Sequence, residues 1–156
     1  MHRLGARGPG GAALREAVVA ATLAPGRAEG APLRLDEPLS FWGGLDPLTG
    51  RIIDRWHPQA GEWVTGRILM MPAGRGSSSG SAALAEALRL GVGPAAILLL
   101  KRDAIVIVGA LAAMELYGRP CPVALVAAED WAQLAAARWL DVFADARHTQ
   151  IRELRS

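Results

Sequence analysis

The chain has 156 residues, of which 51% are hydrophobic and 21% charged, a balance typical of one packed domain and not of a disordered polypeptide. The formal net charge is only +2, and the arginines are scattered without forming a run, which argues against a nucleic-acid partner. Lys101, Arg102 and Asp103 interrupt the longest apolar region, so we expect no membrane span, and without a recognisable export signal we expect a cytoplasmic protein.

The first half of the chain predicts strands separated by irregular segments. Residues 1–12 are rich in glycine and arginine and lack periodicity, so we expect a flexible N-terminal tail there. Pro25 and Gly26 mark a turn, and residues 40–50 contain too much glycine and proline for regular structure. Short apolar or β-rich runs predict strands, although the alanine-rich first run would also suit a helix: 17–23, 32–35 and 63–71.

The second half alternates strands with helices. Continuous apolar runs predict strands over residues 95–100 and 122–126. Helical periodicity predicts helices over residues 81–90, from the 103–109 region to 117, and 129–144. Residues 147–156 are charged and are expected to fray as a C-terminal tail. This order predicts a compact α/β domain over residues 13–146, either β/β/α or three-layered.

The chain offers few metal ligands. Its single cysteine, Cys121, lies between two prolines in an apolar stretch, where we expect a structural role. The histidines His2, His57 and His148 are scattered along the sequence. We therefore expect this chain to bind no metal or cofactor on its own.

The most informative segment is PAGRGSSSGS at residues 72–81, where a predicted strand leads into a predicted helix. Glycines let the backbone turn tightly and approach a ligand, and serines at a helix start leave amide N–H groups pointing outward. Because a helix start also carries a partial positive charge, this segment predicts an anion site. A simpler interpretation is that the serines only cap the helix.

Two phosphate-binding motifs do not fit this segment. A Walker-type loop needs a lysine after its second glycine, and none follows here. The dinucleotide pattern G-x-G-x-x-G begins at Gly74 and Gly76 but has Ser79 where the third glycine should stand. Neither nucleotide class is therefore indicated.

The segment does satisfy the G-x-S-x-G pattern of a nucleophile elbow. On this hypothesis Ser78 is the nucleophile of a small serine hydrolase, assisted by Asp141 or Asp145 and by His148. Against it, the sequence predicts few strands for a hydrolase sheet, and His148 falls in the predicted tail.

Longer stretches of sequence carry a more specific signal. The segments LDEPLSFWGGLDPLTGRIID, HPQAGE, GRILMMPAGRGSSSGS and GVGPAAILL follow one another in the order and spacing of the aconitase X family, and ELYGRPCPV continues the pattern. Over residues 23–128 the chain resembles the swivel domain of that family. The resemblance implies a compact swivelling β/β/α fold and a role as the small subunit of a dehydratase, which is a hydro-lyase.

The resemblance also implies roles for single residues. The G-x-G-S-S part of the loop is similar to the serine loop of the aconitase swivel domain, and by this correspondence Ser77 is the catalytic base. Aconitase has an arginine directly after the two serines, whereas this chain has Ser79, so a tricarboxylate substrate is not expected. The residues expected to bind the substrate are Arg75, Gly76, Ser78 and Ser79 in this loop and Gly43, Gly44, Asp46 and His57 elsewhere.

Members of the family remove water from hydroxy acids with the help of iron, alone or in an iron-sulfur cluster. Because this chain lacks a ligand set, we expect that centre on a large catalytic subunit, with which this chain forms a heterodimer or a larger assembly. The implied substrate is a small anion, either cis-3-hydroxy-L-proline, as in bacterial members, or mevalonate 5-phosphate, as in archaeal members. The many alanines and arginines hint at a GC-rich bacterial genome and so favour cis-3-hydroxy-L-proline. The alternative is a non-catalytic anion-binding or regulatory module of the same fold.

Overall fold

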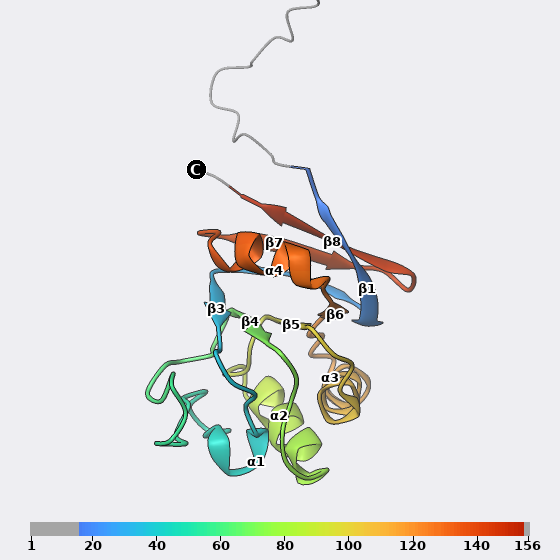
Figure 1. Ribbon diagram of the computed structural model, residues 1–156. Coiled ribbons are helices and arrows are strands. Elements are labelled where there is room, and N and C mark those ends of the chain that lie inside the picture. Colours follow the sequence, from blue (N-terminus) through green and yellow to red (C-terminus); the bar gives the residue numbers. More distant parts are fainter. Residues whose placement is uncertain (1–15, 155–156) are drawn as a thin grey trace, which may run out of the picture.

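The computed structural model describes residues 16–154, which form one mixed sheet of eight strands together with four helices (Figure 1). Across the sheet the strands stand in the order β2-β7-β8-β1-β6-β5-β4-β3. Their bounds are β1 (Val18–Ala24), β2 (Gly26–Gly30), β3 (Pro32–Arg34), β4 (Ile68–Met71), β5 (Ala96–Leu99), β6 (Val123–Leu125), β7 (Leu140–Ala144) and β8 (His148–Glu153). The tail predicted at residues 1–12 lies outside the described residues.

The helices are α1 (Phe41–Gly44), α2 (Ser79–Arg89), α3 (Ala104–Tyr117) and α4 (Ala128–Ala135). Strands β3 to β6 run parallel, and α2 and α3 are the crossovers that join β4, β5 and β6. Every residue of β4 and β5 is buried, and for β5 the continuous apolar run over residues 95–100 predicts this burial on both faces. The predicted strand-loop-helix unit around residues 72–81 is therefore confirmed.

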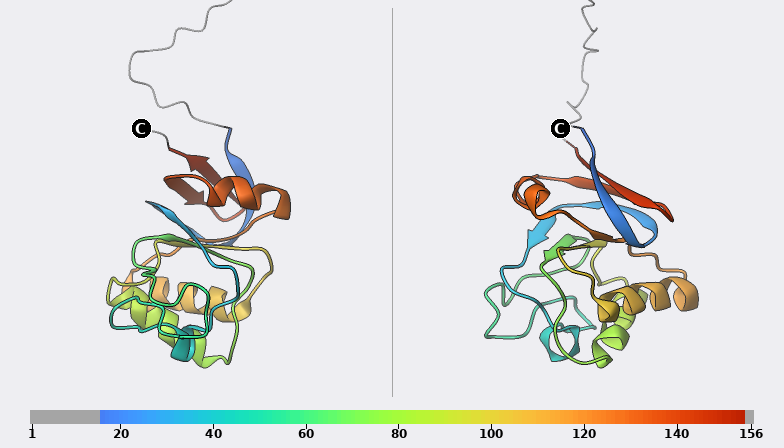
Figure 2. Two further views of the ribbon diagram at one scale, coloured as in Figure 1. Left: turned by 60° about the vertical axis from the view of Figure 1, so that its left-hand side comes forward. Right: turned by 45° about the vertical axis from the view of Figure 1, so that its right-hand side comes forward.

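The other half of the sheet is antiparallel. β1 pairs with β6 and β8, and β7 pairs with β8 and β2. The two edge strands, β2 and β3, are separated in the chain by Ala31 alone, and the sheet curls until it is nearly a barrel (Figure 2). The predicted α/β class and the compact β/β/α arrangement are confirmed.

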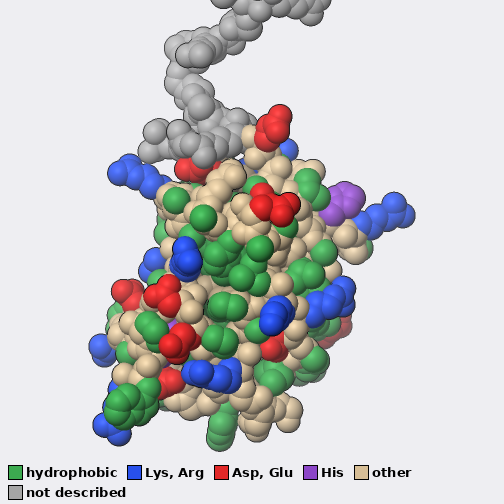
Figure 3. Space-filling view, viewed as in Figure 1, with side chains coloured by type: hydrophobic (Ala, Val, Ile, Leu, Met, Phe, Trp, Pro, Cys, Tyr) green, Lys and Arg blue, Asp and Glu red, His purple; other side chains and the backbone are tan. Residues whose placement is uncertain are grey.

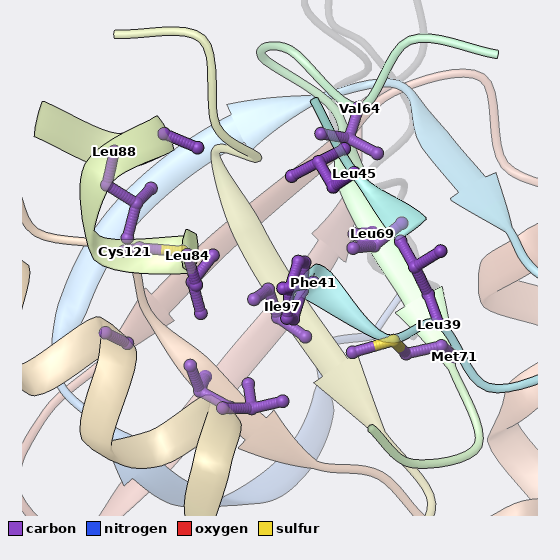
Figure 4. Close-up of a cluster of buried hydrophobic side chains, with 14 of the residues drawn as sticks. Leu39, Phe41, Leu45, Val64, Leu69, Met71, Leu84, Leu88, Ile97 and Cys121 are labelled. Atoms are coloured by element: carbon purple, nitrogen blue, oxygen red, sulfur yellow. The ribbon is translucent and has the colours of Figure 1, made fainter. Parts of the chain in front are cut away.

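Two apolar cores lie on opposite faces of the central strands. Along β4, Leu69 and Met71 pack into the first core against α2 and α3, whereas Ile68 and Met70 pack into the second core against α4. Figure 4 shows the first core, where Leu69 and Met71 gather with side chains from α2 and α1. Each fully buried side chain of this size contributes about 1.5–3 kcal/mol, so the two cores fix the central strands rigidly.

The C-terminal part differs from the sequence prediction. One helix was expected over residues 129–144, but α4 ends at Ala135 and β7 begins at Leu140. Residues 148–153, expected to belong to a tail, form β8, which pairs with strands on both sides. The prediction was wrong because β7 alternates buried and exposed residues, a pattern too short to stand out from the helical spacing before it.

Smaller differences occur in the first half. The expected turn at residues 25–26 leads directly into β2, a strand that the sequence did not predict. The strand expected over residues 63–71 is confined to 68–71, and the irregular loop at 40–50 contains the one-turn α1. No helix between residues 16 and 154 has the length and apolar character needed to cross a membrane.

Candidate functional site

The loops that follow β3, β4 and β5 meet at one edge of the sheet. The backbone N–H groups of Leu100 and Lys101 donate to the carbonyl of Pro72 at 3.1 and 3.0 Å, which joins the loops after β5 and β4. Gly74 forms a bridge with Leu39 in the segment that follows β3. This edge holds the carboxyl ends of the parallel strands, the place where open α/β sheets bind their ligands.

Two glycines allow residues 72–79, which we call the serine loop, to lie close against their neighbours. At Gly74 a Cβ atom would stand 2.8 Å from Oδ2 of Asp103, whose Oδ1 accepts a hydrogen bond from the backbone of α3. At Gly76, where φ is +102°, a Cβ atom would stand 2.5 Å from Oγ of Ser40. The loop is therefore held between the start of α3 and the segment before α1.

The serines stand at the start of α2. The carbonyl of Ser77 accepts a hydrogen bond from the N–H of Gly80 at 3.0 Å, which closes the first turn of the helix. The side chains of Ser77, Ser78 and Ser79 are exposed, and within residues 16–154 their hydroxyls have no hydrogen-bond partner. Side-chain capping therefore does not explain these serines, and their hydroxyls face solvent beside the positive end of α2.

The start of α2 is fixed by contacts with α3. The hydroxyl of Ser81 donates to the carbonyl of Ile105 at 2.7 Å. Gly80 leaves so little space that a Cβ atom there would stand 3.0 Å from Cγ2 of Ile105. The exposed hydroxyls of the serine loop are thus carried by a helix end that has a defined position.

Arg75 links the serine loop to residues 41–63, which we call the second loop. Its Nη2 atom lies 3.8 Å from Oδ2 of Asp54, and its backbone N–H donates to the carbonyl of Leu39 at 3.3 Å. Asp54 is itself held in place because its Oδ1 accepts from the N–H of Trp56 at 3.0 Å. The Arg75 side chain remains 51% exposed, which leaves guanidinium donors available to an anion.

The glycines of the second loop have different surroundings. Gly43 has a φ of +80° and open space where a Cβ atom would stand, so a ligand can approach its backbone. Gly44 is buried, and a Cβ atom there would stand 3.2 Å from Cδ1 of Leu39, so close packing is sufficient to explain a glycine at this position. Oδ1 of Asp46 accepts from the N–H of Leu48 at 2.9 Å, so this carboxylate closes its own turn.

His57 is buried, and both of its ring nitrogens have partners. Nδ1 accepts from the N–H of Gln59 at 3.0 Å, which leaves Nε2 to donate to the carbonyl of Glu37 at 3.1 Å. The ring joins two loop segments through these bonds. We therefore assign His57 a structural role and leave it out of the proposed substrate site.

The members of the hydrolase triad are not brought together. Asp141 and His148 lie in β7 and β8, on the far side of the molecule from Ser78 at the start of α2 (Figures 1 and 2). Asp145 closes the turn between these strands, and hydrogen bonds from the backbones of His148 and Arg147 hold its pKa below the ordinary value. The serine hydrolase hypothesis is wrong.

The potential metal ligands do not form a site. Among residues 16–154, no three histidine, cysteine, aspartate or glutamate side chains gather in a way that could hold a metal ion. Cys121 is buried in the first core, and desolvation by burial raises the pKa of its thiol to about 12. Because metals bind the thiolate, Cys121 does not fit an iron centre.

Comparison with known proteins identifies the family. The model of the aconitase X swivel domain matches residues 17–151, which is most of the sequence. The chain belongs to the aconitase X swivel domain family. The holo-form crystal structure of Thermococcus kodakaraensis aconitase X has the same fold, with a TM-score of 0.70 and 28% identity over 88% of this chain and 98% of that chain.

Relatives of the swivel domain occur in two settings. The cis-3-hydroxy-L-proline dehydratase of Pseudomonas aeruginosa is 45% identical in an alignment that covers 83% of this chain and 23% of that protein. The corresponding enzyme of Hypocrea jecorina is 44% identical over 75% of this chain and 20% of its own length. The phosphomevalonate dehydratase small subunit of Methanothermobacter thermautotrophicus is 40% identical over 67% of this chain and 81% of that subunit.

The chain therefore spans about a fifth of the hydroxyproline dehydratases that it matches and most of the small subunit. Its family is one of dehydratase subunits and domains, and the name of the archaeal relative implies that a large subunit accompanies that protein.

Three residues near the serine loop were not proposed for the site from the sequence. Asp103 and Ser40 fill the space that a Cβ atom would need at Gly74 and Gly76, and Asp54 pairs with Arg75. Asp103 stands directly before a helical run and has the signature of an N-cap, which is a usable signal. Asp54 pairs with Arg75 from a distant segment of the chain, and no local sequence pattern predicts such a contact.

Proposed function

We propose that this chain is the small subunit of an aconitase X type dehydratase and that Ser77 is the general base of the reaction. A large subunit carries the iron or iron-sulfur centre, and the two chains together form the active enzyme in the cytoplasm. The observation that carries the proposal is the exposed, unpartnered Ser77 hydroxyl at the start of α2. It is supported by the family and by relatives that are named dehydratases.

Dehydration requires a base that removes a proton from the carbon next to the one bearing the hydroxyl group. A double bond then forms between the two carbons, and the hydroxyl leaves with its bonding electrons. The proposed partner's iron supplies Lewis acidity for that departure. In this chain, the oxygen of Ser77 accepts the proton, and its alkoxide is stabilised by the amide N–H groups and the positive end of α2.

The substrate's anionic end is proposed to bind beside Ser77. Backbone N–H groups from Gly76 to Ser79 and the hydroxyl of Ser78 offer hydrogen-bond donors in one short loop. Arg75, although paired with Asp54, keeps half of its side chain in solvent and adds a positive charge. Gly43 is proposed as a further point of close approach, because nothing occupies the space beside its Cα atom.

We propose cis-3-hydroxy-L-proline as the substrate. The match to the Pseudomonas aeruginosa hydroxyproline dehydratase covers 83% of this chain, against 67% for the Methanothermobacter thermautotrophicus small subunit. Mevalonate 5-phosphate is the second candidate. This chain covers 81% of the length of the Methanothermobacter thermautotrophicus small subunit, but only 20% and 23% of the two hydroxyproline dehydratases.

The test is turnover by the chain co-expressed with the large subunit from the same organism, measured with both candidate substrates. We expect Ser77→Ala to lower kcat by at least about a hundredfold, because a positioned base contributes about 10²–10⁴. Ser78→Ala is the matched control: it removes a hydroxyl proposed to bind the substrate, so it should mainly raise KM. Turnover that survives Ser77→Ala would show that Ser77 is not the base.

The same experiment separates the remaining alternative. If the chain binds phosphate at the serine loop but gives no turnover of either substrate with the large subunit, it is a non-catalytic anion-binding or regulatory module. The isolated chain, which we propose to be inactive alone, serves as the baseline in each assay.

A further inference from the structure

Beside the serine loop lies an apolar surface that no part of residues 16–154 covers. Trp56 is 86% exposed and Trp42 is 64% exposed, so most of each indole is in water. Leu48, Ile53 and Trp63 are the other large apolar side chains exposed within residues 41–63. Large apolar side chains left exposed close together often mark an interaction site. We call the exposed apolar side chains of this segment the aromatic face: Trp42, Leu48, Ile53, Trp56 and Trp63.

A groove of about 490 Å³ connects the aromatic face to α2. Residues of the second loop form one wall, and the first turns of α2 form the other: Trp42, Pro47 and Ile53 against Ala82, Ala83 and Glu86. Figure 3 shows hydrophobic side chains interspersed with lysine and arginine side chains at this end of the molecule. The groove is wide enough to receive a large apolar side chain from another protein.

Two tryptophans of the aromatic face are stacked against arginines. The guanidinium carbon of Arg51 lies 5.6 Å from the ring centroid of Trp63, and that of Arg55 lies 5.9 Å from the ring centroid of Trp56. Such cation–π contacts restrict the indoles before a partner arrives, which lowers the entropy lost on binding. Tryptophan and arginine are also the residues that most often dominate the binding energy of protein interfaces.

The aromatic face is continuous with the serine loop. Asp54, between Ile53 and the two residues Arg55 and Trp56, pairs with Arg75. The hydroxyl of Ser40 donates to the carbonyl of Trp42 at 2.9 Å and lies against Gly76. A protein that reaches the Ser77 hydroxyl therefore also meets this surface.

We propose that the aromatic face and its groove are the docking surface for the large, iron-bearing subunit, an inference that rests on the proposed function. A stable interface uses about 20–30 residues from each partner, and the residues of 41–63 and of the serine loop that are not buried fall within that range. In the hydroxyproline dehydratases the matching part is only about a fifth of one chain, so a permanent neighbour is present there. Permanent interfaces are the more apolar class, and the exposed tryptophans and the groove agree with this.

The chemistry of the partner follows from this surface. An aliphatic or aromatic side chain of the large subunit fills the groove, and its carboxylates face Arg51 and Arg55, which lie against the indoles of Trp63 and Trp56.

The test measures the dissociation constant between this chain and the purified large subunit from the same organism, by titration calorimetry. Trp42→Ala and Trp56→Ala should each weaken binding by roughly tenfold or more, as truncation of an interface anchor does. Because both side chains are mostly exposed, neither substitution opens a core cavity, and circular dichroism should stay unchanged. Trp139→Ala is the matched control: this residue is 42% exposed in the antiparallel half, and its loss should leave binding within about twofold.

The outcomes distinguish this proposal from the proposed function. Normal binding of Trp42→Ala and Trp56→Ala overturns the docking surface, whereas activity of Ser77→Ala in an intact complex overturns only the catalytic role. Two further results would also overturn the docking surface. One is a dimer of this chain that Trp56→Ala dissociates in analytical ultracentrifugation. The other is Trp56-dependent binding to vesicles of phosphatidylcholine and phosphatidylglycerol.

Discussion

Gly76 is the residue on which the shape of the serine loop depends most directly. Its φ of +102° is unfavourable for residues with a side chain, and a Cβ atom there would stand 2.5 Å from Oγ of Ser40. Ser40 in turn holds the backbone of Trp42 through its hydroxyl. A side chain at position 76 would therefore displace both the proposed base next to it and the start of the second loop.

We expect Gly76→Ala to lower turnover of the assembled enzyme by roughly tenfold or more, since misplacing a reacting group by about 1 Å can cost a hundredfold. The strained backbone should also lower stability by about 1–2 kcal/mol. Gly66→Ala is the matched control, because Gly66 has a φ of +68° but open space around it. It should lose similar stability in thermal unfolding and keep its activity. Full turnover by Gly76→Ala would contradict this account of the loop.

The candidate residues that are neighbours in the chain could be proposed from the sequence alone. Arg75, Ser77 and Ser78 belong to one motif and lie on one exposed loop, and their roles stay predictions. For His57 the sequence leaves two roles open, because a histidine that joins two loop segments looks in sequence like one that contacts a ligand. The sequence could not reveal Asp54, whose partner Arg75 lies in another loop of the fold.

Among the elements, the parallel strands were predictable and the antiparallel ones were less so. β4 and β5 are buried on both faces and therefore appear in the sequence as unbroken apolar runs. β7 and β8 have one exposed face, and their mixed composition resembles an amphipathic helix or a polar tail. β2 is polar at alternate positions and starts at a glycine, so no local pattern marks it as a strand.

Strand β8 provides a direct test of this part of the fold. Ile151 is 1% exposed and packs in the second core, so Ile151→Ala should cost about 2–4 kcal/mol in the free energy of unfolding. Arg152→Ala, at the next and exposed position, should change it by no more than about 0.5 kcal/mol. Urea unfolding followed by circular dichroism measures both. Equal, small effects would mean that residues 148–153 are a tail after all.

At the scale of the whole molecule, the proposed site and the outer ends of β1 and β8 lie at opposite ends of the structure. Val18 pairs with Ile151, so the start of β1 and the end of β8 lie side by side. Figures 1 and 2 show this pair of termini at one end of the molecule and α1 with the start of α2 at the other. The two cores between these ends keep the serine loop at a fixed distance from the start of β1 and the end of β8. Covalent attachment at a terminus should therefore leave the site undisturbed.

We predict that a green fluorescent protein joined to the C-terminus by a flexible linker leaves assembly with the large subunit, and turnover, within about twofold of the unmodified chain. The same protein inserted between Gln59 and Ala60 stands inside residues 41–63 and should abolish assembly, because it blocks the proposed docking surface. Co-purification and a turnover assay measure the two effects, and circular dichroism of the isolated chains reports whether the fold survives. If the terminal fusion abolishes assembly while the fold is retained, the large subunit covers the end of the molecule that carries the termini.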